Sequence, residues 1–139
     1  MTMTQFVDAF TTLLRAALTQ PVEKYWRLQP PTVLTVFVHA SEESGETSIT
    51  VGNVWEEGTT LDVYVETPWN DKEATAEAVD AVVETVKSTV HDNRDLEYAT
   101  GLYAEWGKIA GTNFFMAERP GAGKPVYGAR VRVTYTAAD

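Results

Sequence analysis

The sequence predicts a single α+β domain in which two helices pack on one face of a largely antiparallel β-sheet. In two segments, 6–18 and 79–90, apolar residues recur at steps of three and four, which places them on one face of a helix. In two others, 61–66 and 127–136, apolar and polar residues alternate as in a half-buried strand. The 139 residues are enough for one domain, residues 1–139, with a core of its own.

Polar caps and prolines delimit the N-terminal helix and the segment that follows it. Thr2 and Gln5 have the spacing of a capping box at the start of this helix. Pro21 ends the helix, because proline lacks the amide hydrogen that a helix interior requires. Segment 21–31 has prolines at both ends and the bulky side chains of Tyr25, Trp26 and Leu28 between them, so we expect a packed connection and not a free linker.

Three strands are expected next, as an antiparallel meander. The first, at 32–40, is rich in β-branched residues. A turn at 41–46 leads to the second, at 48–55, and a tight connection at 56–58 leads to the third, at 61–66. The alternation in the third strand places its polar side chains on the solvent face; these are Asp62, Tyr64 and Glu66.

The second helix is expected to begin near Asn70, which has the spacing to cap it together with Glu73, and to pack on the preceding strand. Its core-facing stripe consists of Val79, Val82, Val83, Val86 and Val90. After a polar loop at 91–95, segment 96–119 is expected to hold one or two strands broken by a bulge. A loop at 120–125 then leads to the final strand, at 127–136.

The charge and the composition exclude several classes of function. There are 11 basic against 20 acidic residues, a formal net charge of −9, so this chain is not expected to grip a nucleic-acid backbone. Cysteine is absent, which rules out disulfides and thiolate zinc sites. The first twenty residues do not have the pattern of a signal peptide, and no apolar stretch approaches the length of a membrane span, so no membrane contact is expected.

No motif in the sequence supports catalysis. Segment 119–125, RPGAGKP, lacks the first glycine and the Ser or Thr of a phosphate-binding loop. The two histidines, His39 and His91, lie in different elements without a second ligand at metal-binding spacing. The paired glutamates at 42–43 and 56–57 fall in predicted turns, where solvated charge is the ordinary expectation. We therefore expect no catalytic residue, no cofactor and no metal site.

The aromatic residues are more numerous than a core of this size needs. Large aromatic side chains are enriched at protein interfaces, so some of them indicate self-association. The candidate subunit-interface residues are Trp69, Trp106, Phe114, Phe115 and Met116.

The order and texture of these elements resemble those of the tail-terminator proteins of long-tailed bacteriophages, a family that includes the minor tail protein of lambda-like phages and related neck proteins. The resemblance extends over nearly the whole chain. It rests on the helix FVDAFTTLLRAAL, the stretch TLDVYVETPWND leading into AVDAVVETV, the aromatic and glycine-rich stretch, and the closing strand VYGARVRVTY.

This resemblance implies a structural protein of the virion, in the tail or neck, assembled in the host cytoplasm. It implies a hexameric ring that caps the head-proximal end of the tail tube, ends tube polymerisation and provides the joint to the head. The implied partners are further copies of this chain, the major tail tube protein and the head–tail connector or stopper protein. DNA would pass without specific binding, and acids expected at loop tips are candidates for the lumen: Glu42, Glu43, Glu46, Glu56 and Glu57.

Two other classes fit the residues. One is a small α+β ligand-binding or enzymatic domain whose curved sheet encloses a pocket lined by tyrosines and tryptophans. The other is an acidic partner-binding protein such as a DNA mimic, which the net charge favours but the predicted basic side chains of Arg130 and Arg132 on one strand face disfavour.

Overall fold

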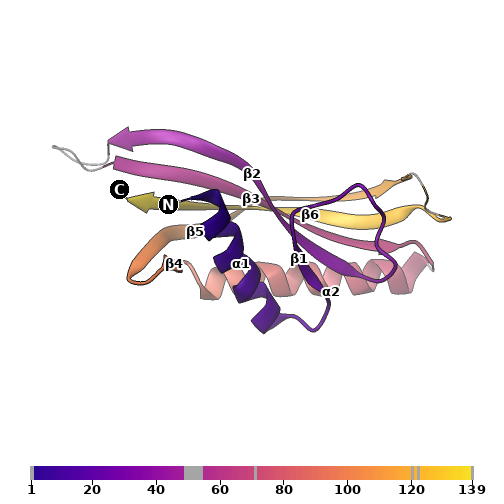
Figure 1. The fold of residues 1–139 in the computed structure, drawn as a ribbon. Helices are drawn as coiled ribbons and strands as arrows, with labels where there is room; N and C mark the ends of the chain where they lie inside the picture. The colour runs from indigo at the N-terminus through magenta and orange to yellow at the C-terminus, as the bar shows by residue number, and fades with distance from the viewer. Residues whose placement is uncertain (1, 49–54, 71, 120, 122, 139) are drawn as a thin grey trace.

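Two helices lie on one side of a six-stranded sheet (Figure 1). The computed structural model describes residues 2–48, 55–70, 72–119, 121 and 123–138, with side chains for all of these except 41–48, 55–57, 72, 137 and 138. In chain order the elements are α1 (Met3–Ala17), β1 (Val22–Lys24), β2 (Thr35–Ser48), β3 (Trp55–Pro68), α2 (Lys72–Asp92), β4 (Leu96–Ala99), β5 (Leu102–Ala117) and β6 (Val126–Ala138).

The sheet has the strand order β1-β2-β3-β6-β5-β4. Neighbouring strands are antiparallel except β1 and β2, which are parallel. Helix α1 contacts both β1 and β4, which lie at opposite edges of the sheet, so the sheet curls around the helices. Helix α2 packs along β3, β6 and β5. The predicted fold class, two helices on one face of a largely antiparallel sheet, is confirmed.

The predicted three-stranded meander is wrong, because β2 and β3 form one long hairpin. Segment 41–46, expected to be a turn, continues β2, and 56–58, expected to be a connection, lies inside β3. Two register shifts in the β2–β3 ladder absorb the turn-forming residues as bulges, so pairing with β3 outweighs their local preference. The expected strand at 48–55 falls mostly on residues 49–54, which lie outside the described residues.

Segment 21–31, expected to be a connection, contains a short strand, β1. Strand β1 pairs in parallel with β2 and buries Val22. Tyr25 then leaves the strand with a left-handed backbone, φ 64°, and its N–H donates to the carbonyl oxygen of Val38 at 2.6 Å. Trp26 is partly buried, whereas Tyr25 and Leu28 are 44% and 60% exposed.

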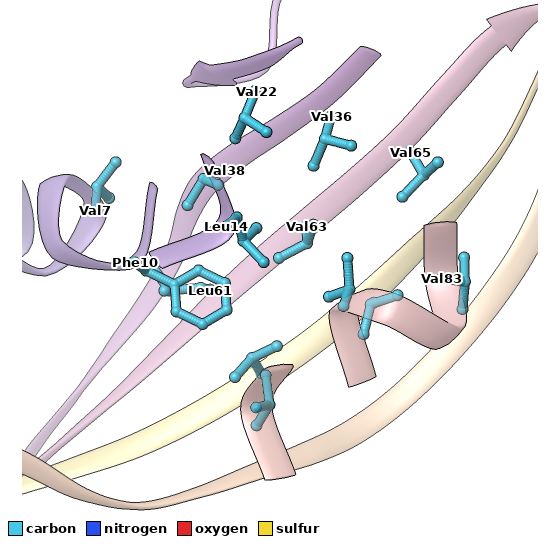
Figure 2. Packing of buried hydrophobic residues seen from close by; sticks show 14 of the residues in the cluster. Val7, Phe10, Leu14, Val22, Val36, Val38, Leu61, Val63, Val65 and Val83 are labelled. Carbon is cyan, nitrogen blue, oxygen red and sulfur yellow. The ribbon is translucent and has the colours of Figure 1, made fainter. Parts of the chain in front are cut away.

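The core fills the space between the helices and the sheet (Figure 2). The capping box of α1 is confirmed: the Gln5 N–H donates to the Thr2 hydroxyl oxygen at 3.1 Å, and the reciprocal bond is 2.9 Å. The predicted stripe of α2 is also confirmed, because all five valines are buried. They meet the inward side chains of β3 and β6, which are Leu61, Val63, Val65, Ala129, Val131 and Val133. At about 1.5 kcal/mol for each fully buried valine, this stripe contributes several kcal/mol to stability.

The ends of α2 differ from the expectation. The helix begins at Lys72, and residue 71, between it and the predicted cap Asn70, lies outside the described residues. At the other end the helix extends through Asp92 into the segment expected to be a loop. There the Asn93 side-chain amide donates to the carbonyl oxygen of Thr89 at 2.9 Å, which satisfies one of the last helical carbonyls.

Segment 96–119 forms the expected pair of strands, β4 and β5, and their tight turn uses Gly101 at φ 74°. Strand β5 has two register shifts against β6, one of them between Glu105 and Lys108. These bulges confirm the prediction of an interrupted strand. Beyond its pairing with β4, the outer edge of β5 runs on for more than ten residues.

Candidate functional site

The face of the sheet opposite the helices holds a buried ion pair between Glu66 on β3 and Arg119, which follows β5. The Glu66 side chain is fully buried and that of Arg119 is 7% exposed. Arg119 donates from Nη1 to Glu66 Oε1 at 2.7 Å and from Nη2 to Oε2, so the pairing is bidentate. The Trp26 indole N–H donates to Oε2 at 3.1 Å, and the guanidinium lies 4.6 Å from the centre of the Trp26 ring. The charge of the carboxylate is therefore balanced by Arg119, and its oxygens accept hydrogen bonds from both Arg119 and Trp26.

This pair overturns the prediction that the polar side chains of β3 face solvent. Asp62 is 3% exposed and Glu66 is buried, while Tyr64 between them is partly buried. Asp62 accepts from Arg132 Nε at 3.0 Å, directly across the β3–β6 ladder. The segment after β1 covers part of this face, with the Trp26 ring 5.9 Å from that of Tyr64. Each buried acid therefore has an arginine partner, as burial of a charge requires.

Gly128 on β6 lies in close contact with the two strands beside it. It lies between Glu66 on β3 and Phe115 on β5 in the sheet register. A Cβ at this position would lie 2.3 Å from the carbonyl oxygen of Val65 and 3.1 Å from the Phe115 ring. Only a glycine leaves room for both neighbours, so a side chain at this position would force β3 or Phe115 to shift.

A shallow hollow of about 330 Å³ lies beside the ion pair, lined by Tyr64, Asn113, Phe115, Arg119 and Arg130. Arg130 Nη2 lies 2.8 Å from the Asn113 carboxamide oxygen when the amide is oriented to accept. Tyr64 and Phe115 supply its aromatic lining, and two of the tryptophans that the structure describes, Trp69 and Trp106, lie elsewhere. Trp69 packs against Tyr127, with ring centres 5.0 Å apart, and Trp106 is 68% exposed.

The five candidate interface residues do not form one patch. Phe114 and Met116 are 49% and 51% exposed and lie opposite Ala129 and Tyr127, on the helix side of the sheet. Phe115 points to the other face, opposite Gly128. Trp106 lies at the far end of β5, eight residues away, or roughly 25 Å along the strand. The four candidates on β5 thus divide between its two ends, and the fifth, Trp69, follows β3. Their role as subunit contacts stays a prediction.

Near Phe114 the surface is hollowed between β5, β6 and α2. This second hollow, of about 290 Å³, is lined by Ala76, Glu77, Asp80, Phe114 and Tyr127. Its aromatic side chains come from the strands, and its carboxylates come from the first turns of α2. Glu77 and Asp80 are exposed and have no salt-bridge partner within 4.0 Å among the residues that the structure describes.

The five acids expected at loop tips lie instead on paired strands. Glu42, Glu43 and Glu46 belong to β2, and Glu56 and Glu57 belong to β3, with Glu46 opposite Glu57. The loop-tip placement is therefore wrong, for the same reason as the predicted meander. From residue 41 to residue 57 the sequence has these five acids and no lysine or arginine. Their role at a lumen remains a prediction.

The two histidines lie in different surroundings, one packed and one exposed. His39 Nδ1 accepts from the Trp26 backbone N–H at 3.2 Å, and its ring meets that of Tyr25 edge-to-face at 6.2 Å. His91 is exposed in the last turn of α2. Within the described ranges, no three His, Cys, Asp or Glu side chains are grouped so that they could hold a metal ion. No helix in the same part of the chain is long and apolar enough to cross a membrane.

Two tyrosines have shifted acidities, each for a structural reason. The hydrogen bond and charge of Glu97 raise the pKa of the exposed Tyr103. Burial, together with the charge of Asp95, raises the pKa of Tyr135 to about 12. The Tyr135 hydroxyl donates to the carbonyl oxygen of Asn93 at 2.8 Å, and its ring meets Phe6 edge-to-face at 5.4 Å. Tyr135 therefore links β6 to α1 and to the end of α2.

Solved structures share this fold, and two of them align with nearly the whole of this chain. The sheath/tube terminator of PVC, an extracellular contractile injection system, in its extended state, aligns over 99% of this chain with a TM-score of 0.60 at 11% identity. This chain spans 56% of the length of that terminator. A second structure, whose name states no function, aligns over 96% of this chain and 91% of its own, with a TM-score of 0.55 at 14% identity. No protein-family model and no curated protein matches the sequence.

Proposed function

We propose that this protein is a terminator of a phage-like tail tube. Six copies form a ring that caps the head-proximal end of the tube, stops its polymerisation and provides the joint to the head connector or stopper protein. The observation that carries the proposal is the fold: almost the entire chain aligns with a protein described as a sheath/tube terminator. The sequence resemblance to tail terminators points in the same direction.

A capping role fits the distribution of surface residues. A ring needs a heterologous contact, in which one surface of a subunit meets a different surface of the next. Exposed aromatic residues at the two ends of β5 provide two such surfaces. The long curled sheet, held by the buried valines of α2, is a rigid frame on which the two surfaces keep a constant relative position. One face of the ring would be complementary to the last ring of tube protein. The opposite face would not be, so a further ring of tube protein could not bind.

The acidic balance fits the passage of DNA without binding. Six copies at −9 each give a ring a formal charge of −54. The hairpin of β2 and β3 carries the acids proposed to line the lumen, where like charge would keep DNA from adhering. Replacing Glu42, Glu43, Glu46, Glu56 and Glu57 with lysine should slow DNA ejection at low salt while rings still assemble. Unchanged ejection kinetics at every salt concentration would remove the lumen assignment.

Tube assembly in vitro tests the main proposal. The tube protein of the same particle is polymerised with increasing amounts of this protein, and tube lengths are measured by negative-stain electron microscopy. We expect shorter tubes with a ring-shaped cap at one end only. Cells that produce the particle without the gene for this protein should yield a lysate with tubes longer than normal. Tubes of unchanged length without caps would refute the capping role.

A ligand-binding domain is the second candidate, and the hollow lined by Tyr64, Phe115 and Arg130 is the observation that favours it. It combines two aromatic walls with a guanidinium group, which suits a small ligand carrying a carboxylate. Calorimetry with aromatic carboxylates separates the two candidates. A monomer that binds such a ligand and leaves tubes unchanged would favour binding over capping.

A further inference from the structure

Trp106 is held in a backbone conformation that its side chain disfavours. Its φ is 60°, in the left-handed region, where a bulky residue is an outlier. It lies in the bulge between Glu105 and Lys108, and its side chain is 68% exposed, the highest exposure among the large apolar residues described. Burial therefore does not account for the choice of tryptophan. Residues in strained conformations cluster at binding sites, where the surrounding structure maintains the strain.

The neighbours of Trp106 hold the bulge in place. The N–H of Gly107 donates to the carbonyl oxygen of Arg94 at 2.9 Å. Gly107 is buried beneath Tyr135, because a Cβ there would lie 2.5 Å from the tyrosine ring. The Tyr135 hydroxyl in turn donates to the carbonyl oxygen of Asn93. The indole is thus an exposed apolar group on a rigid base.

The hollow beside Phe114 has the chemistry to receive an indole. Its volume of about 290 Å³ equals that of roughly ten water molecules in the liquid. Phe114 and Tyr127 offer aromatic rings, and aromatic pairs gain energy beyond the area that they bury. The carboxylates of Glu77 and Asp80 accept hydrogen bonds but cannot donate them, whereas the indole N–H can only donate.

The indole and the hollow cannot meet within one chain. They are separated by roughly 25 Å along β5, and the β4–β5 hairpin and the start of α2 lie at opposite ends of the molecule (Figure 1). We infer that Trp106 of one copy inserts into the hollow of the next copy, between Phe114 and Tyr127, with its N–H donating to Glu77 or Asp80. Lys108, two residues along the strand and exposed, supplies a cation beside the same carboxylates. The contact is heterologous, so repetition builds a ring or an open chain of subunits.

This inference deepens the proposed ring and rests on its self-association, but it does not require that the ring caps a tube. Its test compares the oligomeric mass of the purified protein with that of three variants by light scattering across a concentration series. Trp106→Ala and Phe114→Ser should each weaken self-association by at least about 10-fold, as loss of a central aromatic anchor does. The matched control Leu28→Ala removes another apolar side chain, 60% exposed, and should leave the mass unchanged.

Trp106→Gly separates association from folding. Glycine adopts a positive φ without strain, so this variant should melt at a temperature equal to or above that of the wild type, yet it should remain monomeric. A structural role for Trp106 would instead lower the melting temperature. A wild-type protein that is monomeric at every concentration, or an oligomer that Trp106→Gly and Phe114→Ser leave intact, would overturn the inference.

The chain has no cysteine, which permits a direct test of which surfaces meet. In the double variant Lys108→Cys/Glu77→Cys, a short bis-maleimide should produce a ladder of covalent oligomers, while either single variant should stop at dimers. Adding Trp106→Ala should abolish the ladder, and its persistence would contradict the inference. A ladder without tube capping would refute only the proposed function; capping without a ladder would refute only this contact.

Discussion

Replacing Arg119 with methionine should destabilise the fold by about 3–5 kcal/mol, because it leaves the buried carboxylate of Glu66 without a counter-charge. Glu66 is fully buried, and among the described residues Arg119 donates two hydrogen bonds to its carboxylate and Trp26 donates a third. Methionine keeps much of the volume of the arginine side chain and its contact with the Trp26 ring. The loss is therefore electrostatic and is not a cavity effect.

Urea denaturation followed by circular dichroism measures this loss. The matched control is Lys24→Met, which breaks an ion pair of only 2.6 Å with Asp8, whose side chains are 41% and 48% exposed. Exposed pairs contribute about 0–1 kcal/mol, so the control should lie within that range of the wild type. The loss of stability on removing one partner of an ion pair should therefore depend on the burial of the pair and not on the distance between its charges.

The double variant Glu66→Gln/Arg119→Met completes a double-mutant cycle. It removes both charges, and the glutamine side chain can still accept from the Trp26 indole. Buried ion pairs are often replaceable by neutral groups at little cost, so the double variant should recover most of the stability lost in Arg119→Met. If Arg119→Met and Lys24→Met differ by less than 1 kcal/mol, the description of Glu66 as a desolvated carboxylate is refuted.

Three further predictions concern buried residues of the helices and the sheet. Val83→Asp should unfold the domain, because Val83 is fully buried in the stripe of α2, whereas Ala81→Asp on the exposed side should melt like the wild type in circular dichroism. Gly128→Ala should lower the free energy of unfolding, measured by urea denaturation, by more than about 2 kcal/mol, because its Cβ would lie 2.3 Å from a backbone oxygen. The control is Gly111→Ala, whose Cβ would have nothing within 4 Å, and equal losses of stability in the two variants would contradict the argument. Stability should fall as pH rises from about 10 towards 12, because the pKa of Tyr135 is about 12 in the fold and near 10 when unfolded, so the unfolded chain loses this proton first. Tyr135→Phe should cost about 1 kcal/mol near pH 8 through its lost hydrogen bond, and this deficit should shrink at high pH; a constant deficit would show that Tyr135 is not the group responsible.

Local periodicity was sufficient to predict most helices and strands. The capping box of α1, the valine stripe of α2 and the alternation of β6 each reflect one buried face, and a single face imposes a repeat that is legible in the sequence. The bulged strand β5 was also expected from its glycines. These elements place the core and so determine the fold class.

Elements that depend on distant partners could not be predicted in this way. Segment 41–46 has the composition of a turn, yet pairing with β3 makes it a strand. Strand β1 is only three residues long, and its existence depends on a parallel partner more than ten residues away. Such pairings override local conformational preferences, and the hydrogen-bond partners come from a distant part of the chain that a local pattern does not report.

The sequence by itself determined the helices, the core and the absence of any catalytic motif, because these follow from residue types and short spacings. Only the tertiary structure decided which polar side chains are buried and which aromatic ones are exposed. Glu66 has the alternation of a solvent-facing residue, but Arg119, 53 residues further along, and the segment containing Trp26 enclose it. Trp106 and Phe114 are close in sequence, yet the extended strand β5 holds them roughly 25 Å apart, since each residue of a strand adds about 3.3 Å.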